Sequence, residues 1–214
     1  MDDLPEYYRQ GSRLSLNLAQ NGTEQHLSVT AIVVEAFTPF TILPIPPNTP
    51  LAVLKVYDPR FFSHHTVLLI RPARPWTHTA EAAARSKRTA PWDPAFNPAF
   101  NITEDDDAPV WDEWYYQNAA LHFRSEVAAY ARLAPLQDTG AVLHCYAAGT
   151  LVLEGRAIRP HVLLLEYLPD AKTLCDVDPA VVGLPLMQSL VATAQAFGGL
   201  GVVHTDLREY PVCP

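Results

Sequence analysis

Residues 51–61 read LAVLKVYDPRF, an apolar run that contains one lysine and reaches Asp58-Pro59. Side chains of a β-strand point alternately to its two faces, so this run predicts a strand with two distinct faces. One face carries Val53, Lys55 and Tyr57, and the other carries Ala52, Leu54 and Val56. Because proline has no backbone N–H for a strand ladder, the strand is expected to end by Pro59. Lys55 is therefore expected on a face that it shares with less polar neighbours.

Two further strands are predicted on the N-terminal side, within residues 14–37. Leu14, Leu16 and Leu18 alternate with polar residues, a β-branched run follows, and Asn21-Gly22 lies between the two. Asn-Gly accepts the positive φ angles of a tight turn, so these residues predict a β-hairpin. The segment TILPIPPNTP, residues 41–50, is rich in proline and is predicted to be a connector rather than a strand.

Residues 60–112 lose periodicity and gain proline, tryptophan, histidine and charge. A loop of this length is uncommon inside a compact domain, so the segment is interpreted as an insertion. Its basic cluster of Arg85, Lys87 and Arg88 is interpreted as a solvated loop. Its histidines have no cysteine or acidic partner at ligand spacing, so no metal site is predicted among them. They are His64, His65 and His78.

Helical and strand patterns alternate after the insertion. Residues 112–134 carry an apolar stripe at steps of three and four, which predicts a helix that Pro135 ends. Glu126 borders this stripe instead of facing open water. Strands are predicted within residues 141–155 and 159–168, and a second amphipathic helix over residues 184–197. The stripe of the first helix consists of Tyr116, Ala120, Phe123, Val127, Tyr130 and Ala134.

In this order the motifs resemble those of the protein-kinase-like superfamily, which includes the protein kinases and the aminoglycoside-phosphotransferase type. LAVLKV is similar to the strand of the family that carries the nucleotide-binding lysine, and FRSEVAAYARL, residues 123–133, is similar to its regulatory helix. LLLEYLPD, residues 163–170, is similar to the hinge, and VVHTDLRE, residues 202–209, is similar to the catalytic loop. The resemblance implies an α+β fold: a kinase-like N-terminal lobe with an antiparallel sheet and one regulatory helix, followed by the first helices of the C-terminal lobe.

The resemblance also implies a division of the chain. Residues 1–168 would form the N-terminal lobe, with the insertion at about 60–112, and residues 169–214 would form the hinge and a truncated start of the C-terminal lobe. The helix at 184–197 would then expose apolar surface that a protein partner or missing helices should cover. The chain is expected to be a truncated product or variant of a longer kinase-like protein.

Roles for single residues follow from the same resemblance. Lys55 would contact the phosphates of ATP and pair with the Glu126 carboxylate. Asp206 would accept the proton of the attacking hydroxyl, and His204 would hold the catalytic loop together. Adenine would be bound by Val53, by Leu165 at the gatekeeper position, and by backbone groups of Glu166 and Leu168. Taken one at a time, Lys55 and Glu126 also fit a solvated strand lysine and an ordinary acid on a helix flank.

The sequence departs from the family at three places. The hairpin tip AQNGTEQ, residues 19–25, has one glycine where the family's phosphate-covering loop has several. Pro211 occupies the position of the metal-binding asparagine, and no D-F-G segment follows. ATP and Mg²⁺ are implied as cofactors, but the magnesium ligands are largely missing, and no residue is predicted to bind metal. The chain is therefore expected to be catalytically inactive.

Composition excludes several other classes of protein. The net charge of -8 argues against a nucleic-acid groove, which needs clustered lysine and arginine. No apolar stretch is long enough to span a bilayer, and the acidic N-terminus has no apolar core of a signal peptide. Three scattered cysteines argue against a disulfide framework. The protein is expected to be cytoplasmic or nuclear, not secreted, without nucleic-acid or membrane partners.

Three functions remain open from the sequence. The first is an ATP-dependent protein or small-molecule kinase family member that is incomplete and inactive. The second is a pseudokinase-like module in which Lys55 and Glu126 bind a nucleotide, or in which the insertion binds a protein partner. The third is a structural or interaction protein whose kinase-like motifs are coincidental.

Overall fold

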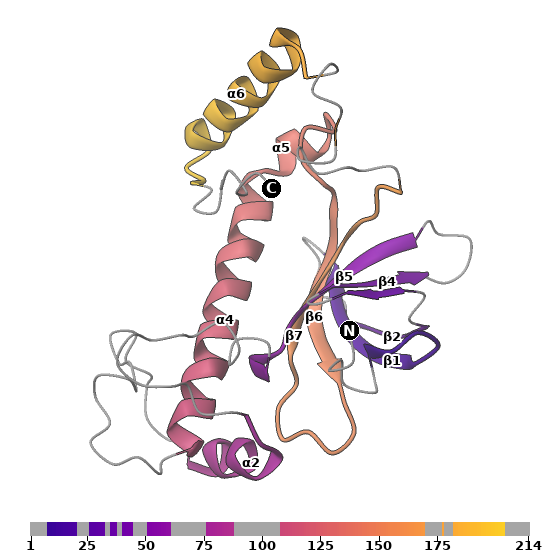
Figure 1. The fold of residues 1–214 in the computed structure, drawn as a ribbon, viewed down its shortest axis with the longest axis vertical. Coiled ribbons are helices and arrows are strands. Elements are labelled where there is room, and N and C mark those ends of the chain that lie inside the picture. Colours follow the sequence, from indigo (N-terminus) through magenta and orange to yellow (C-terminus); the bar gives the residue numbers. More distant parts are fainter. Residues whose placement is uncertain are drawn as a thin grey trace.

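One antiparallel β-sheet and a long helix packed on it form the body of the fold, seen here in a computed structural model (Figure 1). The structure describes residues 8–20, 26–32, 35–37, 40–44, 51–60, 76–87, 108–169, 177 and 182–203. The strands are β1 (Arg13–Gln20), β2 (His26–Ile32), β3 (Glu35–Phe37), β4 (Phe40–Pro44), β5 (Leu51–Tyr57), β6 (Cys145–Val152) and β7 (His161–Glu166). The helices are α2 (His78–Lys87), α4 (Ala108–Arg132), α5 (Ala134–Gln137) and α6 (Leu184–Gly199). The α+β fold class is thereby confirmed at this level.

Seven strands form the sheet in the order β2-β1-β6-β7-β5-β4-β3, and every neighbouring pair is antiparallel. β5, the lysine-bearing strand, ends at Tyr57 as predicted and has neighbours on both sides, β4 and β7. Its predicted alternation is confirmed, because Ala52, Leu54 and Val56 belong to one buried cluster and Val53 and Tyr57 to another. Because β5 pairs with β4 on one side and with β7 on the other, strand pairing on both sides fixes the backbone of Lys55.

The N-terminal hairpin is confirmed, with Ala19 opposite His26 in the pairing of β1 and β2. Its second strand was predicted too long, because β2 ends at Ile32 and β3 begins a separate hairpin with β4. The prediction of a connector over residues 41–50 was wrong for residues 41–44, which lie in β4. β3 reaches only to the residue opposite Ile42, so the missing N–H of Pro44 faces no β3 partner.

The sheet curls so that its two faces have different packing partners. On one face, side chains of β1, β5, β6 and β7 pack against one another as an inner cluster. Leu16 and Leu54 there are 1% and 0% exposed, and full burial of such a side chain contributes about 1.5–3 kcal/mol. The inner cluster comprises Tyr8, Leu14, Leu16, Leu18, Ala31, Ala52, Leu54, Val56, Ala147, Leu151, Leu153, Val162 and Leu164.

Gly149 of β6 lies against the backbone of β1 with no room for a side chain. It lies opposite Leu18, and a Cβ atom on it would be 2.0 Å from the carbonyl oxygen of Asn17. No side chain fits in that space without moving the backbone of β1, so glycine is required there for a packing reason. The close approach lets the outer hairpin curl around the inner cluster.

α4 covers the other face of the central strands, where it contacts β7 and β5 (Figure 1). This helix-facing cluster contains Tyr57, Ala119, Cys145, Leu163 and Leu165, with Val53, Phe123, Val127, Tyr130 and Ala148 packed against it. The predicted stripe thus meets the sheet through Phe123, Val127 and Tyr130. α4 begins four residues earlier than predicted, and Pro135 lies in the first turn of α5, where its missing N–H costs little.

α2 is a helix within residues 60–112, a segment interpreted from the sequence as an insertion without helical or strand periodicity. Its Ala80, Glu81 and Ala84 are buried, and α2 packs against α4. The Thr77 hydroxyl accepts a hydrogen bond from the Ala80 N–H at 3.1 Å, the contact of a helix N-cap. Arg85 lies on the exposed side of this helix, not in a loop as predicted, and Arg88 lies outside the described residues. Three alanines in a row, a strong helix signal, could have indicated α2.

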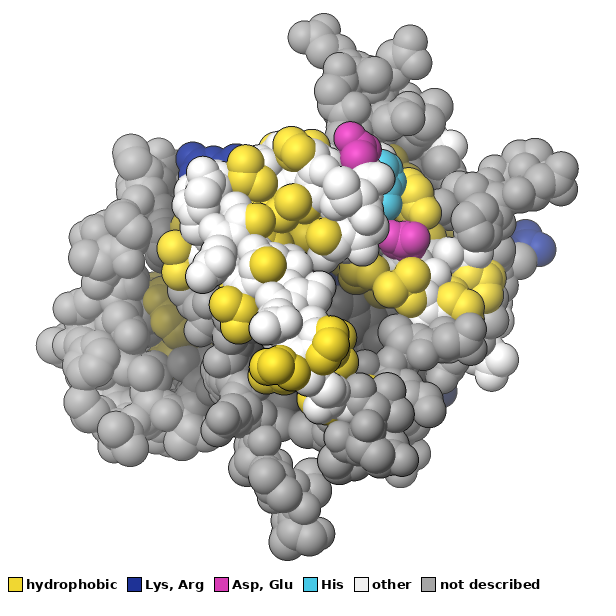
Figure 2. Space-filling view, turned by 90° about the horizontal axis from the view of Figure 1, so that it is seen from above, with side chains coloured by type: hydrophobic (Ala, Val, Ile, Leu, Met, Phe, Trp, Pro, Cys, Tyr) yellow, Lys and Arg dark blue, Asp and Glu magenta, His cyan; other side chains and the backbone are white. Residues whose placement is uncertain are grey.

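α6 is present over the predicted residues but lies at the end of α4 farthest from α2 (Figure 1). None of its residues is buried, and Leu184 and Val191 are 71% and 54% exposed. Figure 2 shows hydrophobic side chains gathered over the upper face of the molecule, where α6 lies. One anchor joins it to α4: Arg132 donates a hydrogen bond to the carbonyl oxygen of Gly201 at 2.8 Å. None of the described helices is long and apolar enough to cross a membrane.

Candidate functional site

Lys55 and Glu126 meet between β5 and α4. The Lys55 ammonium nitrogen lies 2.6 Å from Oε2 of Glu126, and the two side chains remain 25% and 27% exposed. Each is placed by its own element, since β5 is held between two strands and α4 packs on the same face through Phe123 and Val127. Two of the three residues implied to be catalytic are thus in direct contact, although 71 positions separate them in the sequence. The third, Asp206, lies outside the described residues, as does His204.

Tyr57 is a third member of this contact that the motif comparison did not single out. Its hydroxyl donates a hydrogen bond of 2.6 Å to the same oxygen, Oε2 of Glu126. Its ring centre also lies 5.5 Å from the Lys55 ammonium, within cation–π range. Burial, followed by the Glu126 charge, raises the pKa of Tyr57, so the hydroxyl keeps its proton. The signal was present in the sequence, because Tyr57 follows Lys55 by two positions and shares its strand face.

Aromatic contacts hold α4 against the part of the sheet that carries Tyr57 and His161. Phe123 packs its ring edgewise on Tyr57, with ring centres 5.5 Å apart, and stacks on His161 at 4.4 Å. Tyr57 and His161 are opposite each other in the pairing of β5 and β7, so both rings pack against Phe123 of α4. Burial, and secondarily the Arg124 charge, lowers the pKa of His161, which favours the neutral ring against Phe123. These contacts keep Glu126 level with Lys55.

Of the residues implied to bind adenine, Val53 and Leu165 lie on the helix-facing side of the sheet, whereas Glu166 is opposite Ala52 of the inner cluster. Val53 is directly opposite Leu165 in the pairing of β5 and β7, and both belong to the helix-facing cluster. The Glu166 N–H donates to the carbonyl oxygen of His144 at 2.8 Å, so this N–H already has a protein partner. The Glu166 carboxylate in turn accepts a hydrogen bond from the His144 N–H. Leu168 follows β7 and is 48% exposed.

The strand order corrects which hairpin adjoins Lys55. β1 and β2, which flank residues 21–25, are separated from β5 by β6 and β7. The strand beside β5 is β4, where Phe40 is opposite Lys55, and β4 pairs with β3. The comparison of AQNGTEQ with a phosphate-covering loop beside Lys55 therefore does not fit the strand order. The tip between the two strands on the β4 side of β5 is FTPF, residues 37–40, which contains no glycine; residues 38 and 39 lie outside the described part of the chain.

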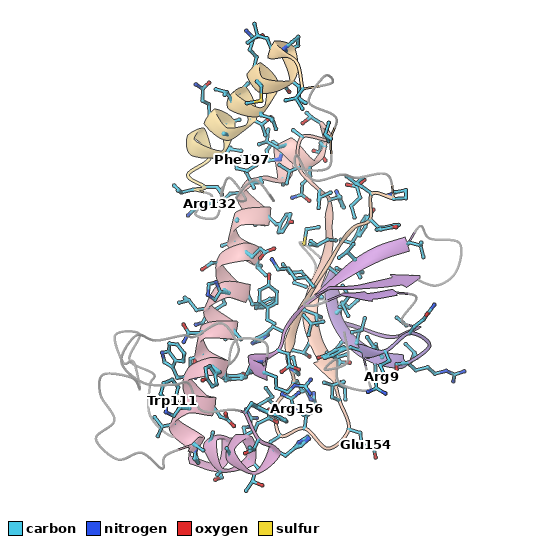
Figure 3. The ribbon with its side chains drawn as sticks, viewed as in Figure 1. Arg9, Trp111, Arg132, Glu154, Arg156 and Phe197 are labelled. Atoms are coloured by element: carbon cyan, nitrogen blue, oxygen red, sulfur yellow. The ribbon has the colours of Figure 1, made fainter. Side chains whose placement is uncertain are left out.

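A second group of charges lies around the buried Arg156, at the end of the molecule opposite α6 (Figure 3). The Arg156 guanidinium lies 3.0 Å from Oδ2 of Asp58 and 2.6 Å from Oε2 of Glu81, and none of its side chain is exposed. Burial acts to raise the pKa of Asp58, but hydrogen bonds and charges from Arg60 and Arg156 outweigh it and hold the pKa at about 2.

Neutral side chains complete this ionic cluster. The Tyr8 hydroxyl donates to Asp58 and the Trp76 indole N–H donates to Glu81, both at 3.0 Å. The Trp76 ring also lies 4.7 Å from the Arg156 guanidinium carbon. All polar atoms of Glu81 and Arg156 thus have protein partners, which identifies the cluster as a structural clamp joining α2, the end of β5 and the β6–β7 turn.

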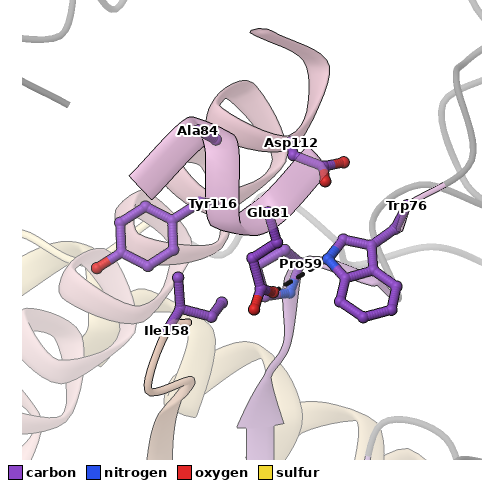
Figure 4. A pocket seen from close by; sticks show the side chains of 7 residues that line it. All are labelled: Pro59, Trp76, Glu81, Ala84, Asp112, Tyr116 and Ile158. Carbon is purple, nitrogen blue, oxygen red and sulfur yellow. Dashed lines mark hydrogen bonds between the residues drawn. The ribbon is translucent and has the colours of Figure 1, made fainter. Parts of the chain in front are cut away.

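Asp112 of α4 is the exception among the buried acids. Only 4% of it is exposed, and no side chain in the described part of the chain donates a hydrogen bond to its carboxylate. It lines a small cavity between α2 and α4 together with Glu81, Tyr116 and Trp76 (Figure 4). Burial, followed by the Glu81 charge, raises the pKa of Asp112 to about 7, while the backbone of Thr77 and, after it, the Arg156 charge act in the opposite direction. The cavity is too narrow for a ligand, so Asp112 is a source of local instability instead of a binding site.

Neither a metal-binding group among the described residues nor a match to a known protein assigns a function to this geometry. Within the described part of the chain, no group of three or more His, Cys, Asp or Glu side chains could hold a metal ion. Pro211, at the position that the family uses for a magnesium ligand, lies outside that part. Comparison with family models, with curated proteins and with solved structures finds no significant match. Any function must therefore be argued from the residues themselves.

Proposed function

We propose that this protein is a nucleotide-binding module of protein-kinase-like fold, in which Lys55 contacts the phosphates of ATP and Glu126 orients the lysine. The observation that carries the proposal is the 2.6 Å ion pair between a central strand and the helix packed on it. It was expected from motif order alone, and each partner comes from the element that the resemblance implies.

The surroundings of the pair support a functional role over a purely structural one. Leu163, directly opposite Lys55, and Leu165 are buried, and Val127 packs in the same cluster. An ion pair set among apolar side chains costs desolvation energy, and replacement with hydrophobic residues is often neutral or stabilising. Because the pair is still about one quarter exposed, a phosphate can reach the ammonium group. Val53 and Leu165 provide an apolar surface beside it for a base.

Binding and catalysis are separate in this proposal. Phosphoryl transfer depends on metal ions that neutralise charge between the phosphates. In the family one ligand is the asparagine that is replaced by Pro211 here, and proline has no side-chain oxygen to offer. We therefore propose a pseudokinase-like binder, with an active phosphotransferase as the alternative within the same family.

ATP-dependent thermal stabilisation, measured with and without Mg²⁺, tests the proposal. A ligand at 100 times its Kd stabilises the native state by about 2.7 kcal/mol, a shift of about 5–10 °C for a chain of this size. The shift should vanish in Lys55→Ala and fall in Glu126→Gln. Arg85→Ala, which removes an exposed cation from α2, is the matched control and should keep the shift. A shift that survives in Lys55→Ala refutes the assignment of the lysine, and absence of a shift in the wild type refutes nucleotide binding.

A second candidate is a protein-binding module, and the exposed apolar surface of α6 favours it. Exposed side chains of this helix include Leu184, Leu186, Met187, Leu190 and Val191. A helix with this much uncovered apolar surface is typical of an interaction site or of a self-associating protein. Sedimentation velocity on the wild type and on Leu190→Gln would distinguish an associating surface from an inert one.

A further inference from the structure

We infer that Tyr57 is a positioning residue of the proposed nucleotide site, because its hydroxyl holds the Glu126 carboxylate in place while Lys55 turns toward a phosphate. This inference rests on the proposed function. It concerns a residue that the motif comparison left without a role, and it predicts an effect that depends on the phosphates of the ligand.

The geometry places two donors on one acceptor. The Lys55 ammonium and the Tyr57 hydroxyl each lie 2.6 Å from Oε2 of Glu126. Both side chains leave β5 on the same face, two positions apart, and a carboxylate oxygen has lone pairs for both. The Glu126 carboxylate is therefore shared between a mobile cation and a second, neutral donor.

The two donors differ in their freedom to move. Lysine has a flexible four-carbon stem and rotatable N–H donors, and a quarter of the Lys55 side chain is exposed. Tyr57 is 4% exposed, and its ring is fixed between β5 and Phe123 of α4. Burial and the Glu126 charge also raise the pKa of Tyr57, so its hydroxyl remains a donor. When Lys55 is drawn to a phosphate, Tyr57 stays on the carboxylate.

This arrangement lowers the free-energy cost of moving Lys55 from Glu126 toward a phosphate. Without the Tyr57 hydroxyl, movement of Lys55 toward a phosphate would remove a hydrogen-bond donor from the part-buried Glu126 carboxylate and leave none in its place, which is unfavourable. With Tyr57, the carboxylate keeps one short hydrogen bond, and α4 keeps its attachment to β5. Tyr57 should therefore increase affinity for ligands that carry phosphates and leave the affinity for a bare nucleoside unchanged.

Isothermal titration with Mg²⁺-free ATP and with adenosine tests the inference. Tyr57→Phe keeps the ring packing and removes only the hydroxyl, so we expect about fivefold to tenfold weaker ATP binding and unchanged adenosine binding. Tyr130→Phe is the matched control. Tyr130 feels the Glu126 charge and packs in the same cluster, but its hydroxyl makes no hydrogen bond to Glu126, so both affinities should stay at the wild-type value.

The outcomes separate this inference from the proposed function. If the wild type binds ATP in a manner that depends on Lys55, and Tyr57→Phe binds ATP equally well, the role of Tyr57 is refuted and nucleotide binding stands. If ATP and adenosine weaken together, the effect is structural and the inference is also refuted. If the wild type does not bind ATP, both proposals fall.

A second measurement covers the case in which Tyr57→Phe does not fold. 3-Fluorotyrosine placed at position 57 keeps the ring and the hydroxyl, and its ¹⁹F resonance reports the strength of the hydrogen bond to Glu126. We expect the resonance to move when ATP is added, because Lys55 then releases part of the carboxylate, and to stay in place when adenosine is added. A resonance that does not respond to ATP would overturn the inference.

Discussion

Replacement of Asp112 by asparagine is expected to stabilise the protein above pH 7 and to have a much smaller effect near pH 4.5. Asp112 is the buried acid at the α2–α4 interface whose carboxylate receives no hydrogen bond from any side chain that the structure describes. Its pKa is raised from 3.8 to about 7, chiefly by burial and then by the charge of Glu81. A neutral amide of the same size removes the buried charge and keeps the shape of the side chain.

The direction of the pH dependence follows from the two pKa values. In the unfolded chain Asp112 loses its proton near pH 4, whereas in the folded protein it keeps the proton until about pH 7. Between these values the folded state binds the extra proton, so this group lowers the free energy of unfolding as the pH rises from about 4 to about 7. A shift of about three pKa units corresponds to about 4 kcal/mol, and partial access of water reduces this to about 2–4 kcal/mol.

Urea unfolding followed by tryptophan fluorescence between pH 4.5 and pH 8 measures the effect. The difference between Asp112→Asn and the wild type should grow from at most about 1 kcal/mol at pH 4.5 to about 2–4 kcal/mol at pH 8, and titration of Asp58 and His161 cancels because both proteins contain these groups. Glu154→Gln, which removes an exposed acid from the β6–β7 turn, is the control and should show no such trend (Figure 3). A difference independent of pH, or an equal trend in the control, would refute the reasoning.

Three further substitutions test other parts of the fold. Arg156→Met should lower stability by about 3–5 kcal/mol in thermal unfolding, because it leaves Asp58 and Glu81 buried without their shared cation; an unchanged melting temperature would contradict the clamp. Gly149→Ala should lower stability by about 3 kcal/mol or more and speed hydrogen exchange in β1, since its Cβ meets a carbonyl oxygen at 2.0 Å. Leu190→Gln, at a site 41% exposed, should reduce binding of a hydrophobic dye and change stability by less than about 0.5 kcal/mol; unchanged dye binding would argue that α6 is not an exposed apolar surface.

Local periodicity was enough to predict the parts of the site that lie within single elements. The alternation around Lys55 placed its neighbours on the correct faces, and the spacing of Phe123 and Val127 placed Glu126 beside the contact between α4 and the sheet. These features depend on side-chain spacing along one strand or one helix, and a sequence displays that spacing directly.

The remaining features depend on partners distant in the sequence. Nothing near Asn21 indicates that its hairpin pairs with β6 instead of β5, because strand order is set by non-local pairing. The average composition of residues 60–112 did not indicate α2, because this helix is buried only through its contacts with α4 and Arg156. Two-residue spacing placed Tyr57 on the strand face of Lys55, but its hydrogen bond to Glu126 depends on where α4 lies along the sheet, which no spacing rule gives.

The clamp around Arg156 has a consequence for how the sequence can vary. Arg156 and Asp58 are 98 positions apart, and Glu81 comes from a third segment, yet the arginine neutralises both acids where all three side chains are buried. Loss of one charge leaves the others buried without an opposite charge, which is strongly destabilising. Joint replacement of all three with apolar residues of similar volume leaves no buried charge and is often neutral or stabilising. Positions 58, 81 and 156 should therefore change together in any set of related sequences, and independent drift at one of them should be rare.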